Sequence, residues 1–236
     1  MINIEEKTTT ALLVQDKSIV SPGDIVAVGM DWLPSSGCFR VGENIKSKYV
    51  GLVRIKDRYI SVIPLAGVYM PRAGDYIIGK VIDIQSTFWI VEINSPYDAL
   101  LQLGEAISEY VDITKTDIST YFDIGDIIYA KILSVNKAKQ VQLTMNERKT
   151  KKLIGGRIVK ISPSKVSRLI GKEGSMIELI KNKTGCQIVA GQNGVVWLKG
   201  QNEQLAEKII KIIEEQSHLS GLTDRIIQMF TAQRGG

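Results

Sequence analysis

Two glycines three residues apart, in the stretch RLIGKEGSM at 168–176, strongly limit what the last third of this chain can fold into. Glycine inside a helix costs about 0.5–1 kcal/mol relative to alanine, so one long helix through both is unfavourable. Apolar residues still recur at helical spacing on either side, with Ile170 before the pair and Ile177 after it. The pattern predicts two short amphipathic helices joined by a tight turn from Gly171 to Gly174.

The segments around this turn alternate between strand and helix patterns. GRIVKI precedes it, and TGCQIVA and GVVWLKG follow it, all with the β-branched composition of strands. The segment SPSKVSRLI predicts a helix start in which Ser162 is the cap and Pro163 lies in the first turn. A last helix is predicted in QNEQLAEKIIKIIEEQ. The order strand, helix, GxxG, helix, strand, strand, helix over 149–236 resembles a type I KH domain, an α+β fold with an extra C-terminal helix.

A further amphipathic stretch follows this predicted domain and is expected to pack back onto it. Its apolar residues at helical spacing are Leu222, Ile226, Met229 and Phe230.

The first two thirds of the chain consist of short β-branched runs separated by turn signals. Residues 1–70 contain the turn SPGD and two runs, YVGLVRI and YISVIPL, that read as a hairpin, which predicts a small all-β domain. Residues 71–148 contain five such runs, with a longer, partly helical connection between the third and the fourth. This arrangement predicts a five-stranded OB-fold β-barrel. The expected fold is therefore multidomain: 1–70, 71–148 and 149–236.

The barrel segment resembles the OB-type RNA-binding barrel first described as a repeat in a ribosomal small-subunit protein. The resemblance rests on GKV at 79–81, IVEI, GDIIYAKILSV and QVQLTM. In such barrels an aromatic pair on the second strand often stacks bases, but here the first of these positions falls on Thr87. Phe88 and Trp89 are neighbours and should point to opposite faces. With Gln102 at a third-strand position often held by histidine, the barrel is expected to guide RNA weakly.

Positive charge is concentrated at the end of the chain. The net charge is +5 overall, yet 150–236 hold 14 basic and 7 acidic residues, whereas 71–149 hold 8 and 11. Because nucleic-acid affinity rests largely on phosphate neutralisation, the last third is the expected place for a polyanion. The alternative is that these lysines only solubilise helix surfaces.

The candidate RNA contacts of the last third surround the glycine pair. Without side chains, Gly171 and Gly174 let a sugar-phosphate backbone approach closely, beside an apolar groove that begins at Ile170. Lys172 adds a mobile positive charge, and two more basic residues on the preceding helix widen the rim, Lys165 and Arg168. Glu173 makes the loop neutral overall. The glycines could instead serve only a tight helix–helix turn.

Five basic residues of the barrel are candidate backbone contacts, although each could be an ordinary solvated residue. They are Lys80, Lys131, Lys137, Lys139 and Arg148.

Nearly the whole chain is similar to the KH-containing RNA-binding cap subunit of the archaeal exosome. The stretches that carry the similarity are VIPLAGVYMPRAGDYIIGKV, INSPYDALLQL, IGKEGSMIELI, GQNGVVWLKG and SHLSGLTDRI. The resemblance implies three copies on a hexameric ring of phosphorolytic subunits related to RNase PH. Residues 1–70 would dock on the ring, and the cap would capture single-stranded RNA and thread its 3′ end inward for 3′-to-5′ degradation. Tyr69, Met70 and Pro71 are candidate ring contacts, or else ordinary hinge packing.

Other function classes find little support in the sequence. Cys38 and Cys186 are the two cysteines and His218 is the single histidine, so a metal knuckle or a histidine-based triad is not expected. No paired-carboxylate site or P-loop is apparent, because Asp123 and Asp126, which flank Gly125, look like turn residues. No cofactor is implied. No apolar run reaches the ~18 residues that span a bilayer, and a cytoplasmic protein without a membrane segment is expected. The open alternatives are a stand-alone RNA-binding regulator and an enzyme.

Overall fold

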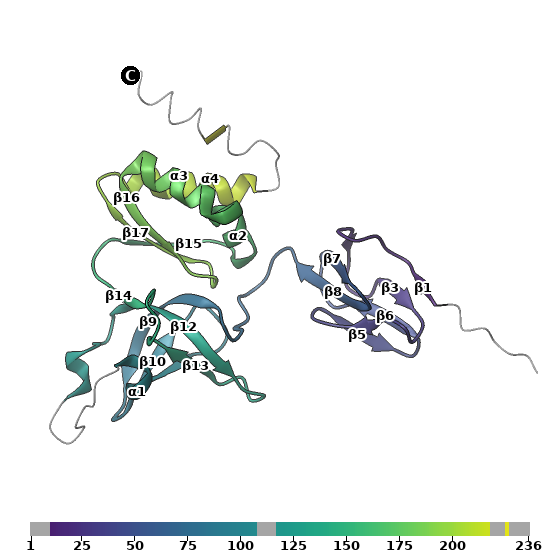
Figure 1. The fold of residues 1–236 in the computed structure, drawn as a ribbon, viewed down its shortest axis with the longest axis horizontal. Coiled ribbons are helices and arrows are strands. Elements are labelled where there is room, and N and C mark those ends of the chain that lie inside the picture. Colours follow the sequence, from purple (N-terminus) through teal and green to yellow (C-terminus); the bar gives the residue numbers. More distant parts are fainter. Residues whose placement is uncertain (1–9, 108–116, 218–224, 227–236) are drawn as a thin grey trace, which may run out of the picture. The chain divides into compact units, whose positions relative to one another are not determined.

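The computed structural model describes residues 10–107, 117–217 and 225–226 (Figure 1). The chain divides into two compact units, Met1–Gly67 and Val68–Gly236. The second unit holds both the barrel and the domain that contains the glycine pair. The multidomain architecture expected from the sequence is confirmed: a β N-terminal domain, a five-stranded barrel and an α+β domain whose elements end with the helix α4 (Glu203–Gln216).

The described part of the first unit is all-β. Its strands form two four-stranded sheets, one in the order β1-β3-β6-β5 and the other in the order β2-β7-β8-β4. The hairpin expected here is confirmed, because β7 and β8 pair along their whole lengths. The bounds are β1 Ala11–Leu12, β2 Ile19–Val20, β3 Ile25–Val28, β4 Leu33–Pro34, β5 Cys38–Val41, β6 Asn44–Ser47, β7 Gly51–Lys56 and β8 Tyr59–Pro64.

The barrel closes because β12 pairs with different strands along its length. The first half of β12 pairs with β9, and its second half pairs with β13. A sixth strand, β14, adds to β12 beside the start of that strand. The bounds are β9 Tyr76–Ile84, β10 Phe88–Glu92, β11 Ala99–Gln102, β12 Ile127–Val135, β13 Val141–Thr144 and β14 Lys151–Leu153.

The connection between the third and fourth barrel strands is partly helical, as expected. It begins with the helix α1, Leu103–Ala106, and includes a single 3-10 turn, η1, at Ile118–Thr120. Residues 108–116 of this connection lie outside the described residues.

Trp89 belongs to the barrel core. Its side chain is fully buried, and its indole N–H donates to the carbonyl oxygen of Phe122 at 2.9 Å. The two rings meet edge to face with centroids 5.3 Å apart. Phe88 is half-buried and occupies the alternate strand position, which confirms that the neighbouring aromatics face opposite ways. The barrel therefore does not present an aromatic pair at this point.

The last domain follows the expected order of elements. Its three strands form an antiparallel sheet in the order β15-β17-β16, and three helices lie on one face of that sheet (Figure 1). Buried aliphatic side chains fill the space between helices and sheet, including Leu169, Ile180 and Ile209. The bounds are β15 Arg157–Lys160, η2 Pro163–Lys165, α2 Val166–Ile170, η3 Lys172–Gly174, α3 Ser175–Thr184, β16 Cys186–Ala190, β17 Val195–Gly200 and α4 Glu203–Gln216.

One detail of the predicted helix start is wrong. Ser162 makes no side-chain cap hydrogen bond; its hydroxyl and its backbone N–H both donate to the carboxylate of Glu214, at 2.7 and 2.6 Å. The Glu214 carboxylate is a charged acceptor, and charged acceptors bind hydroxyl and amide donors more strongly than neutral ones do. The serine thus ties α4 to the start of the helical region.

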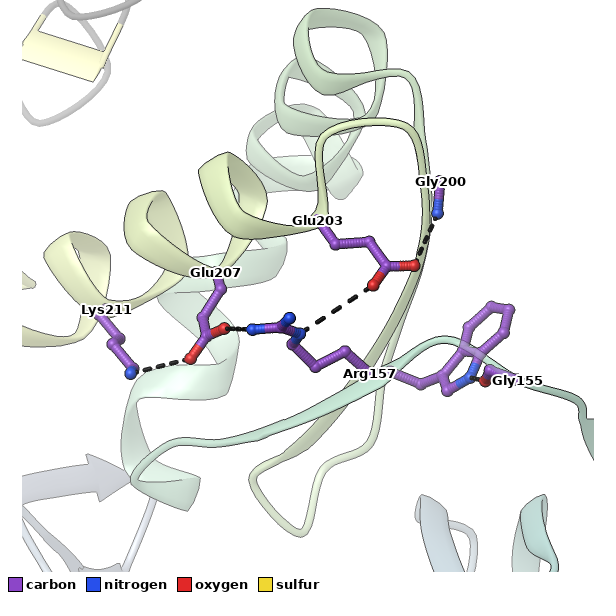
Figure 2. Close-up of polar contacts among 7 residues, drawn as sticks. Gly155, Arg157, Gly200, Glu203, Glu207 and Lys211 are labelled. Atoms are coloured by element: carbon purple, nitrogen blue, oxygen red, sulfur yellow. Dashed lines mark hydrogen bonds and ion pairs between the residues drawn. The ribbon is translucent and has the colours of Figure 1, made fainter.

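A second polar network joins β15 to the start of α4 (Figure 2). The guanidinium of Arg157 lies 2.8 Å from the carboxylate of Glu207 and 4.0 Å from that of Glu203, and Lys211 lies 2.9 Å from Glu207. Hydrogen bonds from Lys211 and Arg157 hold the pKa of the Glu207 carboxyl below its ordinary range. These contacts fix the helix across the edge strand.

The face of the sheet away from the helices packs on the outside of the barrel. Val195 and Trp197 of β17 form a buried cluster with Ile78 of β9 and Leu153 of β14. The indole N–H of Trp197 also donates to the carbonyl oxygen of Gly155, at 2.7 Å. The two domains of the second unit therefore share a packed apolar interface.

The GQNG turn between β16 and β17 completes one edge of the barrel sheet. Among the described strands, β10 pairs with β9 from Lys80 to Ile84 and leaves the earlier residues of β9 open on that side. The backbone N–H of Gln192 donates to Tyr76, and the amide of Asn193 pairs with Ile78. The turn thus takes the place of a strand.

The last amphipathic stretch lies mostly outside the described residues, as do Leu222, Met229, Phe230 and His218. Ile226 is described and is buried in the core of the last domain. Within the described part of the chain, no helix is long and apolar enough to cross a membrane.

Candidate nucleic-acid interface

The turn at the glycine pair has left-handed backbone at three positions. Helix α2 ends at Gly171, whose φ is 75°, and Gly174 precedes α3 with a φ of 83°. Glu173 between them has a φ of 54°, which is uncommon for a residue with a side chain. The side chains of Lys172 and Glu173 are exposed on the outside of this turn.

The two glycines have different structural roles in this turn. A Cβ on Gly171 would lie 2.7 Å from the Cβ of Met176 and 2.8 Å from its backbone nitrogen, so this glycine is required for the turn to form. A Cβ on Gly174 would meet nothing within 4 Å. Backbone beside Gly174 is therefore open to a ligand, whereas Gly171 serves the packing of α2 against α3.

A groove of about 530 Å³ lies beside this turn. Its apolar side comes from α2, α3 and β16, and its other side comes from β12 and from the segment that leads into and includes β14. The lining residues are Ile170, Ile177, Lys181, Ile188, Val189 and Ala190 from the KH-like domain, and Tyr129, Arg148, Lys149 and Lys151 from the barrel side.

The groove carries positive charge. Of its described lining residues, four are basic and none is acidic. Lys181 is ion-paired with Glu178 at 2.7 Å, so the three basic lining residues on the barrel side supply most of the excess charge. An apolar floor with basic edges suits a chain of bases joined by phosphates.

An aromatic pair borders the groove on the barrel side. The rings of Tyr76 and Tyr129 stack with centroids 5.7 Å apart. The pKa of the Tyr129 hydroxyl is raised above its ordinary value, mainly by burial. The ammonium groups of Lys131 and Lys149 lie 5.8 and 5.9 Å from the Tyr76 ring centroid. A hydrogen bond to Glu147, at 2.6 Å, raises the pKa of Lys131.

The structure brings two of the sequence-derived candidates together. Ile170 and Arg148, far apart in the sequence, line the same groove. Arg168 lies on α2 and is exposed, and Lys165 lies at the start of that helix and is half-buried. Lys165 thus precedes α2, whereas the loop from Gly171 to Gly174 follows the end of that helix.

The other barrel candidates do not line this groove. Lys80 lines a different cavity of about 430 Å³, beside Glu92 and Lys160, which are 3.6 Å apart. Lys131 is engaged by Glu147, and Lys137 and Lys139 are exposed in the turn between β12 and β13.

The three candidate ring contacts differ in exposure. Tyr69 is buried in the barrel core, and its hydroxyl donates to the carboxylate of Asp75 at 2.7 Å. Met70 is exposed and Pro71 is half-buried. Tyr69 therefore anchors the start of the second unit, and of the three, Met70 offers the most surface to a partner.

Sequence reasoning missed most of the barrel side of the groove. Tyr129, Lys149 and Lys151 were not singled out, nor was Lys181 on α3. The available signal was in IIYAKIL, where the residues expected on either face of the strand are apolar or aromatic except for Lys131. A barrel strand that is apolar on both faces must pack its outer face against something.

The described residues contain no group of three or more histidine, cysteine or acidic side chains that could hold a metal ion. Cys38 and Cys186 are both buried free thiols, and burial raises the pKa of the Cys38 thiol.

Three family models match consecutive parts of the chain. Residues 17–66 match the N-terminal domain of the exosome RNA-binding protein RRP4, residues 68–134 match the RRP4 S1 domain, and residues 156–204 match a KH domain.

Curated relatives align over most of the chain. "Exosome complex component Rrp4" of Thermococcus kodakarensis is 45% identical over 220 residues, which cover 91% of this chain and 85% of that protein. The protein of the same name from Pyrococcus furiosus is 43% identical over 227 residues, covering 94% and 86%. A solved structure of a candidate exosome complex RNA-binding protein is 36% identical, covers 71% of this chain and 98% of that one, and superposes with a TM-score of 0.65.

Proposed function

This chain belongs to the Rrp4 family of archaeal exosome components. We propose that it captures single-stranded RNA and guides the 3′ end into a ring of RNase PH-like subunits. In this proposal three copies sit on a hexameric ring, and the ring carries out 3′-to-5′ degradation. The cap supplies binding and direction.

The observation that carries the proposal is the basic-edged groove lined by Ile170 and Ile177, the residues on either side of the glycine turn. Its apolar floor can receive bases, and the open backbone at Gly174 allows a phosphate to come close. Backbone clamping of this kind reads no sequence, so RNA can slide through while it is held. That property suits a protein that feeds RNA to another subunit.

The N-terminal unit supports the docking part of the proposal. Large apolar side chains are exposed on this small unit, and where such side chains adjoin they form the apolar patches that are typical of protein–protein contact sites. Among the most exposed are Leu13, Ile19, Met30, Val41, Val50 and Tyr59. The proposal assigns this surface, together with Met70, to contact with the ring.

The types of the matched domains favour a role in RNA binding for this chain and leave RNA cleavage to the ring. The three family models are an N-terminal domain, an S1 domain and a KH domain, and the last two are RNA-binding modules. We assign bond cleavage to the ring for this reason.

The test uses the full chain and purified ring subunits. We expect the two to co-elute from a size-exclusion column and the complex to degrade a tailed RNA faster than the ring alone at limiting RNA. Separate elution at micromolar concentrations would contradict the cap proposal and favour a stand-alone RNA-binding regulator. Degradation by the purified chain alone, abolished by a point substitution in it, would contradict the assignment of cleavage to the ring.

A further inference from the structure

The groove of about 530 Å³ next to the glycine turn, called the KH groove below, has one wall built by the neighbouring barrel domain. Tyr129 of β12 and Lys151 of β14 are direct partners in the antiparallel ladder, so their side chains share one face of the sheet. Both line the groove opposite Ile177 and Ile188 of the KH domain. Two segments from outside the KH domain therefore decide the width and charge of its groove.

The neighbouring residue of β14 points the other way. Lys152 is paired with Asp126, and its ammonium lies 5.9 Å from the centroid of the Phe122 ring. The alternation along β14 thus assigns Lys151 to the groove and Lys152 to the barrel.

Among the described residues that line the groove, the KH side contributes one charged side chain, Lys181 of α3, and it is paired with Glu178. In the turn next to the groove, the charge of Lys172 is offset by that of Glu173. On the barrel side, Arg148 and Lys149 are exposed and line the groove together with Lys151. The barrel side is therefore the larger source of phosphate-binding charge.

Stacking capacity is also on the barrel side. The KH residues that line the groove are aliphatic apart from Lys181, whereas Tyr129 brings an aromatic ring that already stacks on Tyr76. Because the Tyr129 ring is already held by a second ring, stacking a base on it costs the protein less side-chain conformational entropy.

We propose that the barrel completes the KH groove into one composite site for single-stranded RNA, in which Tyr129 stacks a base and Arg148, Lys149 and Lys151 bind the adjoining phosphates. This inference rests on the proposed RNA-capture function and adds to it. It moves the main phosphate contacts from the glycine turn to the barrel side and gives the barrel a stacking residue away from its second strand.

The first experiment removes the barrel-side charge. The full chain carrying Arg148→Gln, Lys149→Gln and Lys151→Gln is compared with a control carrying Arg54→Gln, Lys56→Gln and Arg58→Gln, which loses the same charge from the N-terminal unit. Affinity for a fluorescent single-stranded oligonucleotide is measured at several salt concentrations. Three lost phosphate contacts should reduce the slope of log K against log salt by about 2, and the control should keep the wild-type slope.

The second experiment tests stacking. We expect Tyr129→Leu to weaken binding of an oligouridine by about fivefold or more, and Tyr129→Phe to bind like the wild type, because stacking needs the ring and not the hydroxyl. An oligonucleotide of the same length without bases should bind the wild type, Tyr129→Leu and Tyr129→Phe equally. Thermal melts of each variant establish that it is folded.

The outcomes separate this inference from the proposed function. If the triple variant and Tyr129→Leu bind RNA as the wild type does, while Gly174→Asp still weakens binding, the composite site is wrong and RNA capture stands. If the wild-type chain itself fails to bind single-stranded RNA, both fall. Equal loss with Tyr129→Leu on normal and base-free oligonucleotides would overturn the stacking role.

Discussion

The side-chain amide of Asn193 pairs with both backbone groups of Ile78. Its nitrogen donates to the Ile78 carbonyl at 2.8 Å, and its oxygen accepts from the Ile78 N–H at 3.3 Å. The same nitrogen donates to the carbonyl of Ile93 at 2.9 Å, and Asn193 is fully buried. One side chain of the KH domain thus satisfies three buried backbone groups of the barrel and fixes the register in which the two domains form the groove.

Replacing Asn193 with alanine should lower the free energy of unfolding of the full chain by about 2–3 kcal/mol. The reason is that buried donors and acceptors of the barrel would lose their partners. Urea unfolding followed by tryptophan fluorescence measures the change. Gln192→Ala is the matched control: its side chain also accepts a hydrogen bond from a barrel N–H, that of Tyr76 at 3.2 Å, but this contact is exposed to water, and its loss should stay within about 1 kcal/mol. Equal effects of the two substitutions would contradict the role given to Asn193.

Local patterns predicted the elements well. The hairpin of β7 and β8, the two helices around the glycine pair and the opposite orientations of Phe88 and Trp89 all follow from spacing within a few residues. These features depend on the backbone period and on turn chemistry, which are local properties of the sequence.

Contacts between distant segments could not be predicted in the same way. Ser162 has the sequence of a helix cap, yet its hydroxyl donates to Glu214, a residue 52 positions away. The apolar outer face of β12 indicated a partner, but no local signal named β16 or β17 as that partner. For the same reason the sequence indicated Arg148 as an RNA contact but not which groove it lines, and it did not indicate Tyr129.

Trp89→Phe should reduce stability without changing RNA affinity. The substitution removes the hydrogen bond to the Phe122 carbonyl and leaves part of the core unfilled, which should cost about 1–3 kcal/mol of unfolding free energy. Trp89 is fully buried, so it contacts no RNA in the folded chain. Denaturant unfolding and fluorescence anisotropy measure the two properties separately. A loss of RNA affinity in a variant that remains folded would show that this strand takes part in binding.

Gly174→Asp and Gly174→Asn form a matched pair that differs in charge and hardly in shape. Both side chains tolerate left-handed backbone, and the structure leaves open space at this position. A carboxylate about 4 Å from a phosphate in water costs ~1 kcal/mol, so the aspartate should bind RNA about fivefold more weakly than the asparagine. Equal affinities at moderate salt would show that RNA does not pass Gly174. Gly171 is unsuitable for this test, because a side chain there would collide with Met176.

Glu173→Lys should strengthen RNA binding by about fivefold or more at low salt. It replaces a negative charge beside Lys172 with a positive one, and the gain should shrink as salt screens it. Glu173→Gln should give a smaller gain, because it removes one charge and adds none. Titrations at two ionic strengths measure both variants, and an unchanged affinity for the lysine variant would contradict a phosphate position near this turn.

Crosslinking in the assembled particle tests the central claim most directly. The full chain is combined with the ring subunits and a single-stranded RNA that carries photoreactive uridines along its length, and crosslinked peptides are identified by mass spectrometry. We expect crosslinks to peptides that contain the turn from Gly171 to Gly174 and to peptides that contain Tyr129, together with crosslinks in the ring nearer the RNA 3′ end. Crosslinks confined to ring subunits while the particle degrades the RNA would contradict the account.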